Sequence, residues 1–243
     1  MKIDYPTREQ TEGLCRLWQE AFGDDDAFLD TFWSTAFSSD RCRCITIGGE
    51  VAAALYWFDC RCEKAPMAYL YAVATAKKHR GKGLCRALME DTHGLLAKLG
   101  YAGSILVPGE PGLFAMYENM GYRCFGGMDT TLCEAAEALP VREIDAEEYM
   151  RLRLDFLPQG GVAQEGMAFL ATYARFYTGE GFLLAATENM GLELLGDAAL
   201  AAGIAGALGW NAGKFRVPGA TPFAMYHPLA DGPAPAYFGL AFD

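Results

Sequence analysis

The sequence predicts an α/β protein of two similar lobes, each with a mixed, mostly antiparallel (α+β-like) sheet flanked by helices. Three observations lead to this prediction. A strand, a glycine-rich turn and a helix follow one another between Tyr69 and Leu99, strand signals separated by turn residues come before them, and part of this pattern returns in the second half of the chain. The 243 residues, of which 52% are hydrophobic, suffice to bury sizeable cores.

The first predicted elements are a short strand and two helices. Residues 2–7 have the composition of a strand, and residues 8–22 carry apolar side chains at helical spacing. Gly23 ends this helix, and a second one rich in aromatic residues covers 28–37. The acidic run 24–26 between them is either a solvated helix start or a gate that attracts a cationic substrate.

Three strands in an antiparallel meander are predicted next, over 42–47, 50–60 and 67–75. A two-residue turn at Gly48 and Gly49 would place Cys44 opposite Ala53 and Cys42 opposite Leu55. The two Cys-x-Cys pairs of this region then do not face each other. Because the eight cysteines lack zinc-like spacing, buried free thiols are favoured over a metal site or disulfides.

The turn that follows the third of these strands has the features of a phosphate site. Gly81 and Gly83 allow the backbone to approach a ligand closely, and the free amides at the start of the next helix attract an anion. Apolar residues repeat at helical spacing from Leu84 to Leu99, and Gly100 ends this helix. The helix then leads to a strand at 104–108, which would pair in parallel beside the turn.

Residue spacing separates three interpretations of this turn. A P-loop is excluded because Lys82 is followed by Gly83 and not by Ser or Thr. A dinucleotide-binding turn is excluded because Arg86 stands at the third glycine position and no acidic residue closes the next strand. The sequence Arg80-Gly81-Lys82-Gly83-Leu84-Cys85 instead resembles the Arg/Gln-x-x-Gly-x-Gly/Ala signature of the GCN5-related N-acetyltransferases (GNAT family), although Cys85 departs from it. An ordinary basic turn before a surface helix is the alternative.

This resemblance implies that residues 80–85 hold the pyrophosphate of acetyl-coenzyme A, and that backbone amides around Val73 and Ala74 hold its pantetheine and polarise the thioester. A second stretch, LFAMYENMGY from Leu113, resembles the family's second conserved stretch and places the usual general acid at Tyr117. A tyrosine, whose pKa is ordinarily about 10, is a suitable donor to a departing thiolate at neutral pH. The alternative is that Tyr117 only packs its helix on the sheet.

No general base stands in the obvious place, because the central strand carries Tyr69 and Tyr71 and no carboxylate. Asp59, Glu63 or a water chain are the candidates. In aminoglycoside-modifying relatives the terminal carboxylate enters the active site, so Asp243, after an apolar stretch, is a further candidate.

The second half of the chain contains a repeat. VPGEPGLFAMY at 107–117 returns as VPGATPFAMY at 217–226, and residues 192–209 can be laid on the earlier strand, turn and helix. We therefore predict an acetyl-CoA-binding lobe at 1–133 and a degenerate lobe at 140–243, joined by a linker at 134–140. Residues 141–243 hold six Lys and Arg against twelve Asp and Glu, and Asp197 at the corresponding turn would repel pyrophosphate.

Charge and composition limit the partners. The net charge of −11 argues against nucleic acid or an anionic membrane, and no apolar run has the length of a membrane span. We expect a cytoplasmic enzyme without a metal that acetylates a primary amine of a small, cationic molecule, with homo-oligomer formation left open. A non-catalytic coenzyme A binding or interaction module is the alternative function.

Overall fold

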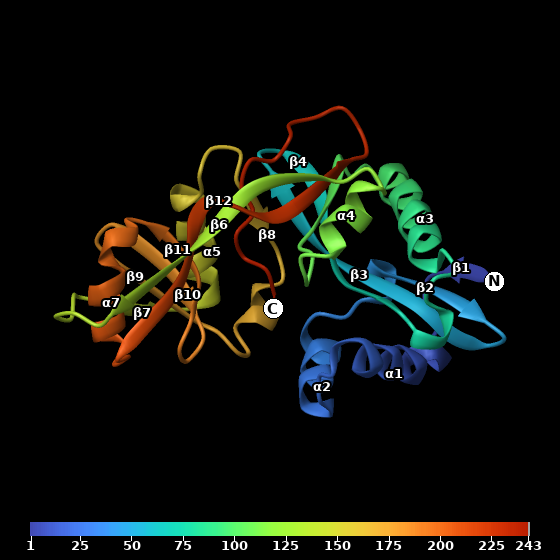
Figure 1. Ribbon diagram of the computed structural model, residues 1–243, viewed down its shortest axis with the longest axis horizontal. Helices are drawn as coiled ribbons and strands as arrows, with labels where there is room; N and C mark the ends of the chain where they lie inside the picture. Colours follow the sequence, from blue (N-terminus) through green and yellow to red (C-terminus); the bar gives the residue numbers. More distant parts are fainter. Residues whose placement is uncertain (243) are drawn as a thin grey trace.

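The computed structural model describes residues 1–242, and Asp243 lies outside the described residues. Twelve strands form one sheet in the order β1-β2-β3-β4-β5-β12-β11-β10-β9-β7, with β6 on β12 and β8 on β3. Figure 1 shows two lobes connected by the long strands β6 and β12. The predicted α/β class with a mixed, mostly antiparallel sheet is confirmed.

The first lobe follows the predicted order of elements. Two helices, α1 and α2, separate the first two strands, and a meander of three strands leads through the glycine-rich turn to α3. The elements are β1 (Lys2–Asp4), α1 (Thr11–Phe22), α2 (Asp26–Thr35), β2 (Cys42–Ile47), β3 (Glu50–Cys62), β4 (Ala65–Thr75), α3 (Leu84–Lys98), β5 (Gly103–Leu106), α4 (Leu113–Glu118) and β6 (Arg123–Glu134), with short 3-10 turns η1 (Arg8–Gln10), η2 (Ser39–Arg41) and η3 (Lys77–His79).

The second half repeats this order in outline: a strand, a helix, antiparallel strands, a turn with a helix, and a last strand. As β4 and β5 do in the first lobe, β11 and β12 pair in parallel, here at Gly191 and Phe215. The elements are β7 (Arg142–Ile144), α5 (Ala146–Phe156), β8 (Val162–Gln164), α6 (Met167–Leu170), β9 (Arg175–Gly179), β10 (Phe182–Ala186), β11 (Gly191–Gly196), η4 (Ala198–Leu200), α7 (Ala201–Ala207) and β12 (Ala212–Pro228).

Two apolar cores cover the two faces of the first lobe's sheet. Leu14, Trp18 and Phe32 of α1 and α2 pack with Tyr56 and Tyr69 on one face. On the other face, α3 and α4 pack on the sheet through a second set of buried residues, which includes Leu84, Leu88, Leu106, Tyr117 and Tyr122. The second set lies beside the predicted phosphate turn.

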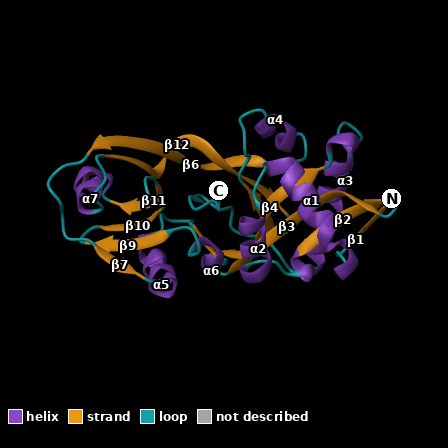
Figure 2. Ribbon diagram, turned by 90° about the horizontal axis from the view of Figure 1, so that it is seen from below, coloured by secondary structure: helices purple, strands orange, loops and turns teal. Residues whose placement is uncertain are grey.

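Parts of the second half complete the first lobe. β8 pairs with the end of β3, and the end of β12 pairs with β5 from Met225 to Pro228. Figure 2 shows β6 and β12 running side by side between the lobes, in agreement with their long antiparallel ladder. The predicted boundary at 134–140 lies between the two lobes along the chain, but the strands of both lobes belong to one sheet.

The cysteine prediction was wrong in register and only partly right about burial. Cys44 faces Ala54 and Cys42 faces Tyr56, because β3 has an extra residue opposite the step from Ile45 to Thr46. Such a bulge shifts every later pair by one residue. All eight cysteines are free thiols, but only Cys42, Cys44, Cys60 and Cys62 are buried, and Cys124 is exposed.

Candidate active site

The site begins where β4 leaves its neighbour β5. The parallel pairs run from Met67 with Gly103 to Tyr69 with Ile105, and β4 then continues alone on this side to Thr75. Its other edge stays paired with β3 as far as Thr75. The end of β4 therefore presents backbone polar groups on the β5 side that no described strand uses.

A bulge distorts β4 at this point. Ala72 and Val73 together face the single residue Leu55 of β3, and Ala72 has a φ of +48°, a conformation that costs a non-glycine residue energy. Beyond the bulge, the Ala76 amide donates to the Ala52 carbonyl at 2.9 Å. Since bonded and non-bonded pairs alternate along an antiparallel ladder, the Ala74 amide faces β3, and Val73 lies at the irregular position.

The glycine-rich turn has the shape that close approach of a ligand requires. Gly81 and Gly83 have φ values of +72° and +77°, and no atom lies within 4 Å of the position that a Cβ would take at either residue. Gly83 is the N-cap of the 15-residue helix α3 and has no side chain to satisfy the first amides of that helix. Free amides and a helix dipole of this kind favour an anion at this position.

The basic side chains of the turn are fixed on its backbone. Arg80 Nε donates to the Thr75 carbonyl at 3.1 Å, and Lys82 Nζ donates to the Lys78 carbonyl at 3.0 Å. Both side chains are exposed. The bond to Thr75 engages only one of the guanidinium nitrogens of Arg80, and a guanidinium carries five N–H donors in all.

Tyr117 lies in the same apolar core as the start of α3. The side chain is buried, with 6% of its surface exposed, and it packs edge-on against Tyr122 with ring centroids 5.8 Å apart. Burial, together with the neighbouring Cys85, raises the pKa of Tyr117 well above its ordinary value. The hydroxyl is therefore protonated at neutral pH, as a proton donor must be.

Residues 2–125, slightly more than half of the chain, match the family model described as the acetyltransferase (GNAT) domain. The chain belongs to the GNAT family. Members of this family use acetyl-coenzyme A, so the protein is an acyltransferase with an acyl-coenzyme A donor. No curated protein matches the sequence.

Several solved structures have the same fold as this GNAT protein over nearly its whole length. A GCN5-related N-acetyltransferase from Kribbella flavida is 19% identical, with a TM-score of 0.72, and the match covers 93% of this chain and 70% of that one. One from Anabaena variabilis is 13% identical, with a TM-score of 0.71 and 94% and 72% coverage. A putative acetyltransferase from Pyrococcus horikoshii is 14% identical, with a TM-score of 0.64 and 93% and 89% coverage.

The two carboxylates predicted as base candidates lie away from the turn of the GNAT lobe. Asp59 stands opposite Ala68, where β4 is still paired, and its oxygens accept from Arg41 Nε at 3.0 Å and from the Tyr101 hydroxyl. Glu63 lies in the β3–β4 turn at the opposite end of β4 from Thr75. Asp243 lies outside the described residues, whereas Phe242 accepts a 2.8 Å hydrogen bond from the Tyr71 hydroxyl.

The acidic run of residues 24–26 is bonded locally. Asp25 caps α2 by accepting from the Phe28 amide at 2.9 Å, and Asp24 accepts from Trp18 Nε1 at 2.7 Å. Asp26 accepts from Gln19 at 2.6 Å. These contacts are those of a helix start and of packing between α1 and α2, and they leave the negative charge of the run in place.

The corresponding turn of the second GNAT-like lobe contains a negatively charged side chain, Asp197. The Asp197 carboxylate accepts from the Ala199 amide at 2.9 Å and so takes up a donor at the start of η4. A Cβ on Gly196 would lie 2.1 Å from the Gly181 carbonyl oxygen, so the backbone is already packed there. This turn lacks both the open space and the positive charge of residues 80–85.

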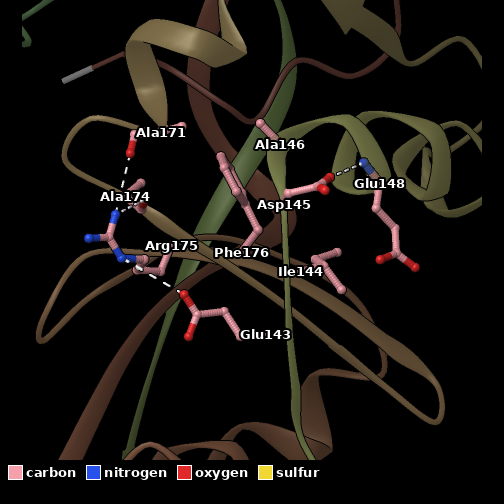
Figure 3. Close-up of a pocket in the computed structure, with 9 residues that line it drawn as sticks. All are labelled: Glu143, Ile144, Asp145, Ala146, Glu148, Ala171, Ala174, Arg175 and Phe176. Atoms are coloured by element: carbon pink, nitrogen blue, oxygen red, sulfur yellow. Dashed lines mark hydrogen bonds and ion pairs between the residues drawn. The ribbon is translucent and has the colours of Figure 1, made fainter.

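A pocket of about 640 Å³ lies in the second lobe, between β7, β9 and the start of α5. Figure 3 shows its charged side chains bonded to neighbours: Asp145 caps α5, and Arg175 contacts Glu143 and the carbonyls of Ala171 and Ala174. It is remote in the fold from the GNAT turn and from Tyr117, and it provides none of the predicted site residues.

Sequence reasoning missed a polar cluster behind Tyr117. Tyr122 lies between α4 and β6, Ser104 on β5 and His93 on α3, and their polar atoms lie within 2.8–3.1 Å of one another. The only sequence signal was the aromatic residue after Gly121, because Ser104 and His93 are distant in the chain. Among residues 1–242, no three potential metal-binding side chains come together, and no helix has the length and apolarity to cross a membrane.

Proposed function

We propose that the first lobe is an N-acetyltransferase that moves the acetyl group of acetyl-coenzyme A directly to a primary amine of a small, cationic substrate. One observation carries this proposal: an open, basic turn leads directly into the apolar core that holds a buried, protonated tyrosine, beside the unpaired end of a bulged strand. A binding module needs the turn but has no use for the tyrosine.

The turn fits the pyrophosphate of coenzyme A. Gly81 and Gly83 leave room for the phosphates, and the first amides of α3 donate to their oxygens. Arg80 and Lys82 add positive charge from the turn, and Leu84 and Cys85 close the apolar side next to Tyr117. Ala74 and Val73 of β4 would lie along the pantetheine, with the Val73 amide as the donor to the thioester carbonyl.

The residues support a direct transfer in one step. The amine nitrogen forms a bond to the thioester carbon, the carbon–sulfur bond breaks, and coenzyme A leaves as a thiolate. Tyr117 donates its hydroxyl proton to that sulfur. With Asp59 and Glu63 at the other end of β4, the ammonium proton leaves through water.

The second lobe is proposed to be degenerate, to cover residues 140–243 and to shape the substrate side of the first. The protein is proposed to act in the cytoplasm and without nucleic acid or membrane partners, in keeping with its net charge of −11.

The test is incubation with acetyl-coenzyme A and a broad panel of amines, with free thiol as the readout. We expect thiol release that depends on the amine, and an acetylated amine detected by mass spectrometry. Binding of coenzyme A without turnover of any amine would support the alternative, a non-catalytic coenzyme A binding or interaction module.

A further inference from the structure

Tyr117 has no hydrogen bond that would orient its hydroxyl. Among residues 1–242, no side chain or backbone group bonds to this oxygen, although the side chain is almost fully buried. The direction of the hydroxyl is therefore set by the backbone of α4 and by the rings that pack against Tyr117. A proton donor must be held close to its acceptor, because small displacements cost rate.

Tyr122 contacts both the backbone and the ring of Tyr117. The Tyr122 amide donates to the Tyr117 carbonyl at 3.1 Å, next to a 2.9 Å bond from the Met120 amide. Its ring meets the Tyr117 ring edge-on, with an interplanar angle of 65°. The position of Tyr117 thus depends on where the Tyr122 ring stands.

The Tyr122 ring is itself held by a closed set of three polar contacts. Its hydroxyl lies 2.8 Å from Ser104 Oγ and 2.8 Å from His93 Nε2, and these two atoms are 3.1 Å apart. Ser104 is completely buried, and His93 and Tyr122 nearly so. Ser104 lies on β5, His93 on α3, and Tyr122 in the connection between α4 and β6, all around the proposed site.

A residue from the second half of the chain closes this cluster. The His227 ring of β12 stacks on the His93 ring, with centroids 4.3 Å apart and an interplanar angle of 7°. The same ring lies 3.0 Å from the position of a Cβ on Gly121, whose φ is +89°. Any side chain at Gly121 would push against this stack and move the segment that joins Tyr117 to Tyr122.

His93 stays neutral in this position. Burial, together with the neighbouring His227, lowers the pKa of His93 to about 3. The imidazole therefore offers Nε2 as one donor or one acceptor to the two hydroxyls at neutral pH. Three neutral groups that satisfy one another make a rigid support without a buried charge.

We propose that Tyr122, held by Ser104 and His93, is the positioning residue for Tyr117, the acid of the proposed acetyl transfer. This inference rests on the proposed function of Tyr117. The cluster does not touch the reacting atoms; it sets the direction of the proton donor through the ring contact and the backbone bond. Simple core packing would account for the burial but would give these residues no effect on the rate of folded enzyme.

The experiment compares Tyr122→Phe with Tyr149→Phe at equal amounts of folded protein. Both changes remove a buried tyrosine hydroxyl, but Tyr149 bonds to Glu193 in the second lobe. We expect Tyr122→Phe to lower kcat by about 10- to 100-fold, with the KM for acetyl-coenzyme A within about twofold of wild type. Tyr149→Phe should leave kcat unchanged.

A double variant separates positioning from general damage. If Tyr122 acts through Tyr117, then Tyr122→Phe lowers kcat in the wild-type background and has no further effect in Tyr117→Phe. Equal losses in the two backgrounds, or wild-type kcat in Tyr122→Phe, would overturn the inference. Where Tyr122→Phe does not fold, Ser104→Ala and His93→Gln are judged by the same two comparisons.

The two proposals fail in different ways. A Tyr117→Phe enzyme with wild-type turnover removes Tyr117 as the acid and with it the proposed mechanism. A slow Tyr117→Phe enzyme beside a fast Tyr122→Phe enzyme removes the positioning role alone.

Discussion

Arg86 donates a 3.1 Å hydrogen bond from Nη1 to the carbonyl of Asn119, which ties the first turn of α3 to the end of α4. The proposed phosphate site lies at one end of this link and the proposed acid, Tyr117, at the other. The two functional parts are therefore held by one local connection, in addition to their shared apolar core. This arrangement lets substitutions separate cofactor binding from chemistry.

Reversing charge in the turn should weaken coenzyme A binding. Arg80→Glu and Lys82→Glu each remove a charge-assisted contact worth about 1.5 to 3 kcal/mol, which corresponds to a dissociation constant raised about 10- to 150-fold. Lys64→Glu is the matched control, because Lys64 is exposed in the β3–β4 turn at the other end of β4. Titration calorimetry measures the affinities. Equal affinity of wild type and both turn variants would contradict the assignment.

Tyr117→Phe should reduce turnover and leave coenzyme A affinity unchanged, since only the proton donor is lost. A positioned acid usually contributes about 10²- to 10⁴-fold. Because burial raises the pKa of Tyr117, its deprotonation lies above its ordinary pKa of about 10, and the wild-type rate should show no decline from this group between about pH 7 and 9. Steady-state rates over this range check both expectations. A decline there that Tyr117→Phe abolishes would place the pKa lower than burial implies.

The sequence predicted the first lobe well because its signals are local. The strand, the two glycines and the periodic helix of residues 69–99 each follow from neighbouring residues, and they appear as β4, the turn and α3. The Tyr117 helix was also predicted. The bulges at Ala72 and opposite Ile45 were not, because a bulge depends on how the partner strand is placed.

The repeat shows that local sequence alone does not determine the secondary structure. Phe114-Ala-Met-Tyr117 lies in helix α4, whereas the identical residues 223–226 lie in strand β12. In the second copy, Met225 is paired on both sides, with Leu106 of β5 and Cys124 of β6. Tertiary pairing thus decides the conformation of a sequence that is helical elsewhere in the chain.

The polar cluster behind Tyr117 could not be predicted from the sequence, for a different reason. His93, Ser104 and His227 lie on three separate elements and Tyr122 in the connection between α4 and β6, and no spacing rule links the four residues. In the structure, the His227 ring packs on the His93 ring.

One coenzyme A should bind per chain, in the first lobe. The second turn has Asp197 bonded to the Ala199 amide, and its carboxylate repels phosphate. Calorimetry should give a stoichiometry of one, and Arg80→Glu/Lys82→Glu should reduce the same single event. A stoichiometry of two would show that the second turn is intact as a site.

The buried ion pair of the second lobe should be important for stability. Arg153 donates two hydrogen bonds to the Glu193 carboxylate, at 2.7 and 2.9 Å. The Tyr149 and Tyr237 hydroxyls donate to the same carboxylate at 3.0 and 2.9 Å. Glu193→Gln leaves Arg153 buried without its counter-charge, so we expect a loss of about 3 to 5 kcal/mol in the free energy of unfolding. Urea denaturation measures it, with the exposed Glu137→Gln as control. A loss below about 1 kcal/mol would show that the pair is dispensable.

The charge of the protein is unevenly distributed. Five basic residues gather near the turn between Lys77 and Arg86, although the whole chain carries −11. The remaining surface is therefore strongly acidic, and the residues 24–26 between α1 and α2 keep their charge while they cap and pack. A negative field raises the local concentration of cations.

We therefore predict that small cationic amines, such as polyamines, aminoglycoside-like compounds or amines derived from amino acids, are acetylated in preference to neutral or anionic acceptors. Because salt screens charges over about 8 to 10 Å near physiological ionic strength, the KM for a multivalent amine should rise when salt is added. The KM for acetyl-coenzyme A should also rise with salt. In Arg80→Glu/Lys82→Glu, the salt dependence of the acetyl-coenzyme A KM should disappear, whereas that of the amine KM should remain. Asp26→Asn, which keeps a side-chain oxygen for Gln19, should raise the KM of the amine alone. An amine panel at low and moderate salt decides the matter, and preferred turnover of anionic acceptors, or a multivalent cation without salt dependence, would refute the prediction.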